Sequence, residues 1–245
     1  MNNPATRSAI ILGAGASDGV GGALARRFAG HGLHAIVAGR TESKVRSIAQ
    51  EIGANGGSAE GVRADVTSEA DQDALFDLAT ARGPISAVLY NAGNNAIVPF
   101  EQLDASTMES FWRVGSYGAF LTAKRAVPIL KAQSEGSLFF TGASASLRGK
   151  PNFAHFASMK ACLRMLAQSL AREFGPAGIH VAHVVIDGVV GGEIVRSRFG
   201  EYLEQLGEDG CLKPEAIADA FWYLHTQHRS AWTHEIDLRP FKENW

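Results

Sequence analysis

The sequence predicts an α/β protein with a single doubly wound parallel sheet of about seven strands and helices on both faces. Two observations predict this fold. Short apolar segments alternate with longer amphipathic ones along all 245 residues, and such alternation produces parallel βαβ units. A glycine-rich turn also follows the first apolar segment, where doubly wound folds place their ligand-binding turn. No linker, repeat or low-complexity segment divides the chain, so residues 1–245 are expected to form one domain.

Seven segments are short and rich in apolar or β-branched residues, as buried strands are. They are Ser8–Leu12, Leu33–Ala38, Ser58–Val62, Ser86–Asn91, Ser137–Thr141, His180–Ile186 and Trp232–Leu238. Between them lie longer segments with the apolar periodicity of helices. They are Gly21–Gly30, Glu42–Ile52, Glu69–Arg82, Phe111–Lys131, Asn152–Phe174 and Pro214–Gln227. Thr41 and Ser68 precede two of these segments and are predicted to cap the helices.

The composition excludes several classes of function. The chain has 23 Lys and Arg residues against 25 Asp and Glu, a formal charge of -2. Because it also lacks a basic block, neither a nucleic acid nor an anionic membrane surface is expected as a partner. The content of 46% hydrophobic and 20% charged residues is typical of a soluble globular protein. A small molecule is therefore the expected partner.

The cysteines and the N-terminus bear on location. Cys162 and Cys211 lie far apart and belong to no CxxC or His/Cys cluster, so neither a disulfide scaffold nor a metal site is expected. The apolar run Ala9–Leu12 is too short for a membrane span or the core of a signal peptide. These features predict a cytoplasmic protein without a membrane segment.

The glycine-rich turn follows the first predicted strand. Gly15, Gly19 and Gly21 form a GxxxGxG pattern and not GxGxxG, because Asp18 stands where the third glycine would fall. A strand, a glycine turn and a helix N-terminus present backbone N–H groups and the positive end of a helix dipole to a pyrophosphate. The residues expected to contact a dinucleotide here are Gly15, Ser17, Asp18, Gly19, Val20 and Gly21. The alternative is a turn that is rich in glycine for tight packing alone.

The end of the second predicted strand favours NADP(H) over NAD(H). NAD(H) is commonly held by a carboxylate about 20 residues after the glycines, whereas this strand is followed by Gly39, Arg40 and Thr41. Without a carboxylate, a 2′-phosphate meets no repulsion, and the Arg40 guanidinium is suited to bind it. The alternative is that Arg40 is a solvated charge at the start of a helix.

Further motifs follow in order along the chain: Ala64–Val66 after the third predicted strand, Asn91–Gly93 after the fourth, and Lys160 on a long helix. With these motifs the chain resembles the short-chain dehydrogenase/reductase family over essentially its whole length. The resemblance implies a Rossmann-type domain and hydride transfer between a nicotinamide and a carbonyl or alcohol carbon. The further cofactor contacts that it implies are Asp65, Val66, Asn91, Ala92, Gly93, Lys160, Gly188 and Val189.

The catalytic residues of the family are mostly replaced. The resemblance places Phe156 at the position of the family's tyrosine, Ala143 at that of its serine and Gly115 at that of its asparagine. Lys160 alone is kept. Phe156 has no O–H group, so the family's proton donor is missing. Phe156 also fits a buried helical stripe with Met159, which is an ordinary structural reason for its presence.

Two neighbouring residues are candidate substitutes for the missing acid or base. His155 precedes Phe156 and has an unperturbed pKa near neutrality, although a surface or subunit-contact role is the simpler explanation for it. Asp187 directly follows the sixth predicted strand and faces the expected cleft, with a turn or helix cap as its alternative. Ser144, beside Ala143, would need a shift of one residue to replace the family's serine.

These features predict an NADP(H)-dependent oxidoreductase that acts without the family tyrosine on an acceptor needing little protonation, for example an iminium. The alternative is a catalytically silent NADP(H)-binding sensor or oligomer subunit, and a cofactor-free lyase is disfavoured because the cofactor motifs are kept. The segment of residues 189–212 is expected to close over the substrate. Surplus apolar residues on the long helices, including Trp112, Tyr117 and Phe120, predict a homodimer or homotetramer.

Overall fold

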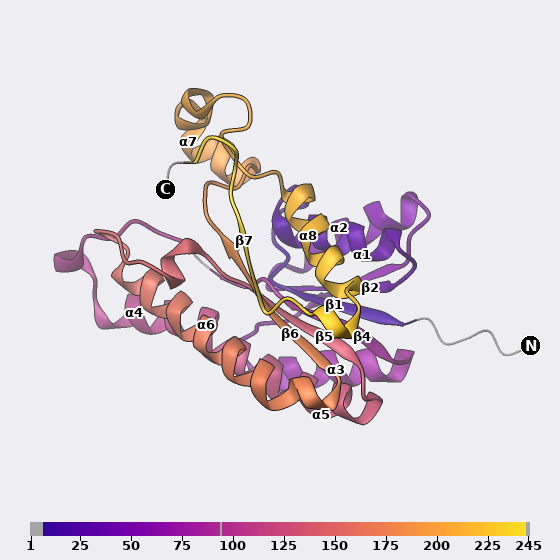
Figure 1. The fold of residues 1–245 in the computed structure, drawn as a ribbon. Helices are drawn as coiled ribbons and strands as arrows, with labels where there is room; N and C mark the ends of the chain where they lie inside the picture. The colour runs from indigo at the N-terminus through magenta and orange to yellow at the C-terminus, as the bar shows by residue number, and fades with distance from the viewer. Residues whose placement is uncertain (1–6, 94, 244–245) are drawn as a thin grey trace, which may run out of the picture.

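Seven parallel strands form one sheet in the order β3-β2-β1-β4-β5-β6-β7 (Figure 1). The computed structural model describes residues 7–93 and 95–243. The strands are β1 (Ser8–Leu12), β2 (His34–Gly39), β3 (Ala59–Arg63), β4 (Ile85–Tyr90), β5 (Gly136–Thr141), β6 (Ile179–Ile186) and β7 (Glu235–Leu238). The predicted α/β fold is therefore confirmed. β1 has its predicted bounds, whereas β7 begins at Glu235 and not at Trp232.

The order of the strands reverses beside β1. This strand pairs with β2 on one side and with β4 on the other, so the chain returns from the edge strand β3 to the centre of the sheet. In doubly wound sheets, ligands bind at this point, outside the carboxyl ends of the strands. The fold therefore creates a binding region beyond the ends of β1, β4, β5 and β6.

Helices cover both faces of the sheet (Figure 1). α1 (Val20–Gly30), α2 (Glu42–Ala54) and α8 (Pro214–Thr226) pack on one face, and α3 (Glu69–Arg82), α5 (Gly118–Gln133) and α6 (Ala154–Phe174) on the other. Ala9 and Ile11 of β1 join the first apolar cluster, and Ile10 and Leu12 join the second. Because side chains alternate across a strand, one continuous apolar run supplies both cores.

The prediction of one helix over Phe111–Lys131 is wrong. The helix begins earlier, as α4 (Ala105–Trp112), passes through a five-residue π-helical segment at Arg113–Tyr117, and continues as α5. Gly115 lies in the π segment and is buried against Met159 of α6. The π-helical turn therefore lies where the chain packs against α6, which a period of 3.6 residues does not reveal.

Helix α7 (Glu193–Leu206) was not predicted, because its residues were assigned only to a segment that closes over the substrate. Two backbone hydrogen bonds join the ends of this segment: Leu212 N–H donates to Val189 O at 2.8 Å, and Gly191 N–H donates to Leu212 O at 2.8 Å. The segment is thus a loop whose two ends are hydrogen-bonded to each other after β6. Figure 1 shows this loop, with α7, projecting beyond the sheet.

The predicted caps differ in outcome. The Ser68 hydroxyl accepts a hydrogen bond from the Asp71 N–H at 3.2 Å, as a helix cap does. Thr41 stands at the N-cap position of α2, but its side chain makes no cap hydrogen bond. None of the described helices is long and apolar enough to cross a membrane. Within residues 7–93 and 95–243, no three His, Cys, Asp or Glu side chains group closely enough to hold a metal ion.

The ends of β1 and β4 approach each other so closely that Gly13 tolerates no side chain. Its φ is +92°, and a methyl group on it would lie 2.4 Å from the Cα and N atoms of Ala92. The Gly13 and Ala14 N–H groups both donate to Ala38 O of β2, at 2.9 and 3.1 Å. Gly13 thereby fixes the start of the glycine turn against two neighbouring strands.

Replacement of Gly13 by alanine should therefore destabilise the protein more than replacement of Gly32. Gly32 has a similar φ of +86°, but a methyl group there meets no atom within 4 Å. Gly32→Ala should cost about 1 to 2 kcal/mol for backbone conformation, and Gly13→Ala about 1 to 3 kcal/mol more for overpacking. Urea unfolding measures both free energies, and equal losses would contradict the close approach of β1 and β4.

Candidate active site

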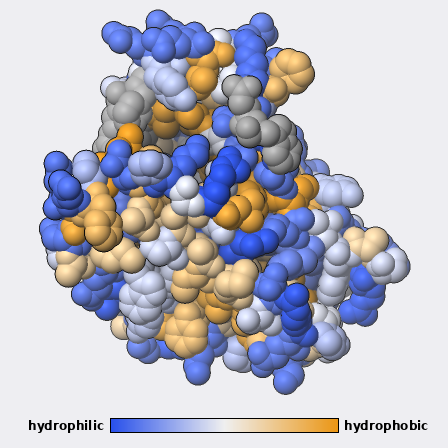
Figure 2. All heavy atoms as spheres, turned by 60° about the vertical axis from the view of Figure 1, so that its left-hand side comes forward, coloured by the Kyte–Doolittle hydropathy of each residue, from blue (hydrophilic) through white to orange (hydrophobic). Residues whose placement is uncertain are grey.

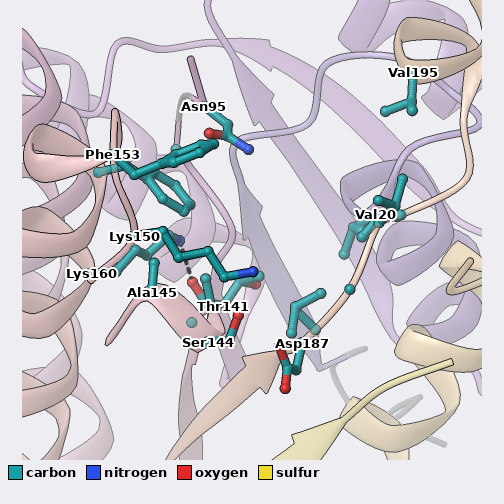
Figure 3. Close-up of a pocket in the computed structure, with 18 of the residues that line it drawn as sticks. Val20, Asn95, Thr141, Ser144, Ala145, Lys150, Phe153, Lys160, Asp187 and Val195 are labelled. Carbon is teal, nitrogen blue, oxygen red and sulfur yellow. Dashed lines mark hydrogen bonds between the residues drawn. The ribbon is translucent and has the colours of Figure 1, made fainter. Parts of the chain in front are cut away.

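A cavity of about 790 Å³ opens at the carboxyl ends of the central strands. Its walls come from the glycine turn, the residues after β4, β5 and β6, the N-terminal end of α6, and α7 (Figure 3). Most of its lining is apolar, and a few polar groups converge on its floor, as in small-molecule sites generally. Figure 2, which brings the left-hand side of Figure 1 forward, shows apolar residues exposed among hydrophilic ones on this side of the molecule.

A chain of hydrogen bonds runs across the floor of the cavity. The Asn91 amide group donates to Gly13 O at 3.2 Å, and its carbonyl oxygen accepts from the Thr141 hydroxyl at 3.0 Å. The Thr141 backbone carbonyl then accepts from Lys160 Nζ at 2.7 Å (Figure 3). These contacts tie the ends of β1, β4 and β5 to α6. They therefore fix the lysine relative to the glycine turn.

Lys160 is 5% exposed and faces the cavity. Burial lowers the pKa of its ammonium group to about 8. A methyl group on Gly93 would lie 3.5 Å from Lys160 Nζ, and the ring centroid of Phe156 is 5.8 Å from the same atom. The side chain is thus held between the turn after β4 and the first turns of α6.

The glycine turn fits an anionic group. Helix α1 begins after Gly19, and no side chain caps its first N–H groups, so these donors are available to a ligand. A methyl group on Gly15 would meet no atom within 4 Å, whereas one on Gly21 would lie 2.7 Å from Ala14 Cα. Gly21 thus brings helix and strand together, Gly15 faces open space, and Val20 lines the cavity.

Two polar side chains of the turn, Ser17 and Asp18, form hydrogen bonds or ion pairs within the protein. The Ser17 hydroxyl donates to the Glu51 carboxylate at 2.5 Å, and Arg26 donates to Ser17 O at 2.9 Å. Asp18 accepts from the Glu193 N–H at 2.6 Å and forms an ion pair with Arg196. Asp18 therefore holds the start of α7 against the glycine turn.

Beyond β2, Gly39 is followed by the exposed side chains of Arg40 and Thr41. A methyl group on Gly39 would lie 2.3 Å from Ala14 O, so the close approach excludes a side chain there. Burial raises the pKa of Asp65, but hydrogen bonds from the Thr67 N–H and hydroxyl, with the charges of Arg40 and Arg63, bring it below its usual value. Val66 follows as a buried residue.

Comparison with known proteins identifies the family of this chain. A family model described as short chain dehydrogenase matches residues 9–201. The chain belongs to the short chain dehydrogenase family. YuxG of Bacillus subtilis (strain 168), described as an uncharacterized oxidoreductase, is 36% identical over 190 residues, which are 76% of this chain. The chain spans 28% of the length of that relative.

Two solved structures have the same fold. A short-chain dehydrogenase from Rhodopseudomonas palustris superposes with a TM-score of 0.83 at 32% identity, covering 96% of this chain and 99% of that chain. A metagenomic short-chain oxidoreductase in complex with NADP gives a TM-score of 0.80 at 22% identity, covering 97% and 98%. The similarity to both structures therefore extends over almost the whole chain.

In this member of the family, Phe156 and Ala143, which the sequence resemblance places at the positions of the family's tyrosine and serine, both reach the cavity. Phe156 and Ala143 line it, with the Phe156 ring 6.4 Å from that of Phe153. Gly115 does not line it: a methyl group there would lie 1.9 Å from Met159 Sδ. Met159 is 1% exposed, so its side chain fills the space beside Gly115.

The two candidate substitutes have different positions. His155 is fully buried, and its ring packs edge-on against Phe111 with centroids 4.3 Å apart. It is absent from the described cavity lining, and neither of its ring nitrogens has a hydrogen-bond partner among the described residues. A surface role is thus excluded for the single chain. Asp187 does line the cavity and is 3% exposed.

Asp187 is held as a carboxylate. Burial raises its pKa, but hydrogen bonds from Ser144 and Arg148 and the charges of Arg148 and Arg239 outweigh burial and lower the pKa below its usual value. Arg148 lies 2.8 Å from one carboxylate oxygen and Arg239 lies 3.9 Å from the other. At neutral pH this group therefore has no proton to donate.

Several residues of the site were missed by sequence reasoning. Thr141 ends β5 at the carboxyl edge, and its position after a buried strand was a usable signal. Arg148 and Lys150 line the cavity from the loop between β5 and α6. Their closeness in the sequence was a second usable signal.

The role of Met159 could not be predicted, because it depends on the distance between two helices, which the sequence does not give. Gly188 and Val189, which the family resemblance assigned to the cofactor, also line the cavity, and Gly188 has a φ of +151°.

The contact between Gly115 and Met159 predicts strong coupling between these positions. Gly115→Ala should destabilise the protein by about 1 to 3 kcal/mol, and Met159→Ala by about 2 to 5 kcal/mol. The stability loss of the double variant should be smaller than the sum of the two single losses by at least about 0.5 kcal/mol. The reason is that the shorter side chain at position 159 makes room for the methyl group added at position 115. Gly53→Ala on α2, where a methyl group meets no atom within 4 Å, is the control. Additive losses in urea unfolding would contradict the packing described here.

Proposed function

We propose that the chain is an NADP(H)-dependent oxidoreductase that transfers hydride between a nicotinamide and a small molecule, without a tyrosine at position 156. The main support is a series of hydrogen bonds that links Gly13, Asn91, Thr141 and Lys160. These bonds lie at the floor of a cavity of about 790 Å³. The uncapped start of α1 supports pyrophosphate binding. The bound cofactor would supply a hydride at nicotinamide C4.

The residues around the cavity would bind the cofactor, exclude water and cover the substrate. Lys160 would hold the nicotinamide ribose, and Gly188 and Val189 would line the nicotinamide side. The apolar walls at Phe153 and Phe156 would exclude water from the reacting atoms. Asp65 and Val66 would contact the adenine. The segment of residues 189–212, with Asp18 holding the start of α7, would cover the substrate.

The chemistry is limited by what these residues lack. Reduction of a ketone creates an alkoxide, and loss of one oxyanion donor costs about 2.7 to 4 kcal/mol, while loss of a proton donor costs about 10² to 10⁴ in rate. Phe156 and Ala143 offer no donor, and Asp187 is ionised. The substrate should therefore be an acceptor that needs little protonation. The second candidate, a silent NADP(H)-binding protein, is favoured by the apolar side chain of Phe156 beside Lys160.

The preference for NADP(H) is supported at the end of β2. Because Gly39 lies against Ala14 O, this position has no room for the carboxylate that binds a bare ribose. The exposed Arg40 side chain is suited to a 2′-phosphate, and its charge acts on Asp65 at the adenine side. The metagenomic short-chain oxidoreductase of the same fold was solved with NADP, which is consistent with this choice.

We expect Arg40→Ala to weaken NADPH binding by about 1.5 to 3 kcal/mol, the range for hydrogen bonds to charged groups, and to leave NADH binding nearly unchanged. Arg46→Ala is a matched control, because Arg46 is an exposed arginine of α2 that pairs with Glu42. Fluorescence titration measures the affinities. Equal affinities of the unaltered protein for NADH and NADPH would refute the assignment.

Restoring the lost hydroxyl groups should create ketone reductase activity. Ala143→Ser with Phe156→Tyr places both groups at the cavity wall and should raise the reduction of simple ketones by at least about 10²-fold. Gly115→Asn requires Met159→Ala in the same chain, because Met159 occupies that space. Phe153→Tyr, which adds a hydroxyl elsewhere in the cavity, is the control. Strong ketone reduction by the unaltered protein that survives Asp187→Ala and His155→Ala would contradict this account.

We also propose that the chain forms a homodimer or homotetramer through α4 and α5. Trp112 and Phe120 are 43% and 46% exposed, and the rings of Trp112, Tyr117 and Phe120 stack in a row with centroids 5.6 and 6.4 Å apart. Met108 and Met165 are also exposed. A row of exposed apolar side chains on neighbouring helices is typical of an interface between copies.

Light scattering should therefore give a multiple of 26.1 kDa at micromolar concentration. Phe120→Asp should shift the protein toward the monomer, because it places a charge in the row of stacked rings. Phe241→Asp should not, since Phe241 is 90% exposed and lies outside this row. A monomer of the unaltered chain would show that the proposed interface does not form.

A further inference from the structure

Some charged side chains that line the cavity form ion pairs with neighbouring groups, and others do not. Asp187 is held by Arg148 at 2.8 Å and by Arg239 at 3.9 Å, and Arg239 also pairs with Asp237 at 2.7 Å. These two arginines and two aspartates balance each other. Lys160 is bound to Thr141 O and is assigned to the cofactor. Two charged lining residues remain, Lys150 and Glu243.

Glu243 belongs to the cofactor side. A methyl group on Gly188 would lie 3.6 Å from Glu243 Oε2, and Gly188 is assigned to the nicotinamide. Lys150 lies on the other wall, beside Phe153. Of the described residues on that wall, Lys150 is the one charged group without an ion pair or hydrogen bond from its side chain. Lys150, whose side chain is exposed, therefore leaves one unpaired positive charge on this wall of the cavity.

Lys150 is presented by a fixed turn. The Phe153 N–H donates to Lys150 O at 3.3 Å, and the Val98 N–H donates to Asn152 O at 2.9 Å. Asn152 has a φ of +67°, a conformation that asparagine tolerates better than most residues. Figure 3 shows the Lys150 side chain extending inward across the cavity, in front of Lys160 and toward the Thr141 and Asp187 side.

We propose that the substrate carries a carboxylate group on an apolar body, and that Lys150 Nζ binds this carboxylate. The proposal rests on the proposed function and names its substrate class. The apolar body would lie against Ile97, Phe153 and Phe156, which also line the cavity. A site with apolar walls and one well-placed charge fixes the orientation of such a molecule.

The charges favour a carboxylate over other groups. A cationic acceptor, such as the iminium considered from the sequence, would meet the ammonium groups of Lys150 and Lys160. A phosphate monoester, with its higher charge, commonly takes several donors or a helix N-terminus, and this wall offers one free ammonium group. A single lysine matches a single negative charge.

The experiment measures binding to the full chain saturated with NADP⁺, using probes that cannot be reduced. Isothermal titration calorimetry at neutral pH compares 3-phenylpropanoate with 3-phenylpropanamide, which has the same body without the charge. The carboxylate should bind at least about tenfold more tightly, as expected for a hydrogen bond between charged groups. This preference should vanish in Lys150→Met and persist in Lys150→Arg. It should also persist in Lys131→Met, a control at an exposed lysine at the far end of α5.

Equal binding of carboxylate and amide, no binding of either, or a preference that survives Lys150→Met would overturn the proposal. Tighter binding of 3-phenylpropylammonium or of 2-phenylethylphosphonate would overturn the assignment to a carboxylate. The NADP⁺ affinity of each variant is measured first. If NADP⁺ fails to bind the unaltered chain, the proposed function fails; if it binds but the carboxylate preference is absent, the inference about Lys150 alone fails.

Discussion

The contact between the ends of β1 and β4 is the constraint on which the site depends. At Gly13 the segments that follow the two strands are too close for any side chain, and the Asn91 side chain bridges Gly13 O and the Thr141 hydroxyl there. Thr141 in turn holds Lys160. The glycine turn and the lysine come from distant parts of the sequence, yet one short series of hydrogen bonds sets their separation.

The opposite wall of the cavity differs in chemical character from this framework. The floor is polar and tightly bonded, whereas Phe153, Phe156 and Ala143 offer no donor to a reacting oxygen. Behind this wall, Met159 packs beside Gly115, so an asparagine has no space at position 115. Under the proposed function, the polar floor would bind the cofactor, whereas these three side chains would not stabilise charge that develops on the substrate.

Much of the fold could be predicted from the sequence, because strand and helix periodicity is a local property. The glycine turn, Asn91 and Lys160 could also be predicted, since each follows a strand or matches a family motif at the edge where parallel strands end. The π segment at Arg113–Tyr117 and the burial of His155 were not, because both depend on how α4, α5 and α6 pack. The engagement of Asp18 by α7 likewise required three-dimensional contact between residues far apart in sequence.

The proposed cofactor framework faces a wall that lacks a tyrosine hydroxyl. A crystal structure of the chain with NADPH would show whether this framework binds the dinucleotide. We expect the nicotinamide ribose on Lys160, the pyrophosphate at the start of α1, and nicotinamide C4 directed into the cavity toward Phe156 and Lys150. A nicotinamide displaced from the cavity by the Phe156 ring, or a dinucleotide bound away from the glycine turn, would contradict this expectation.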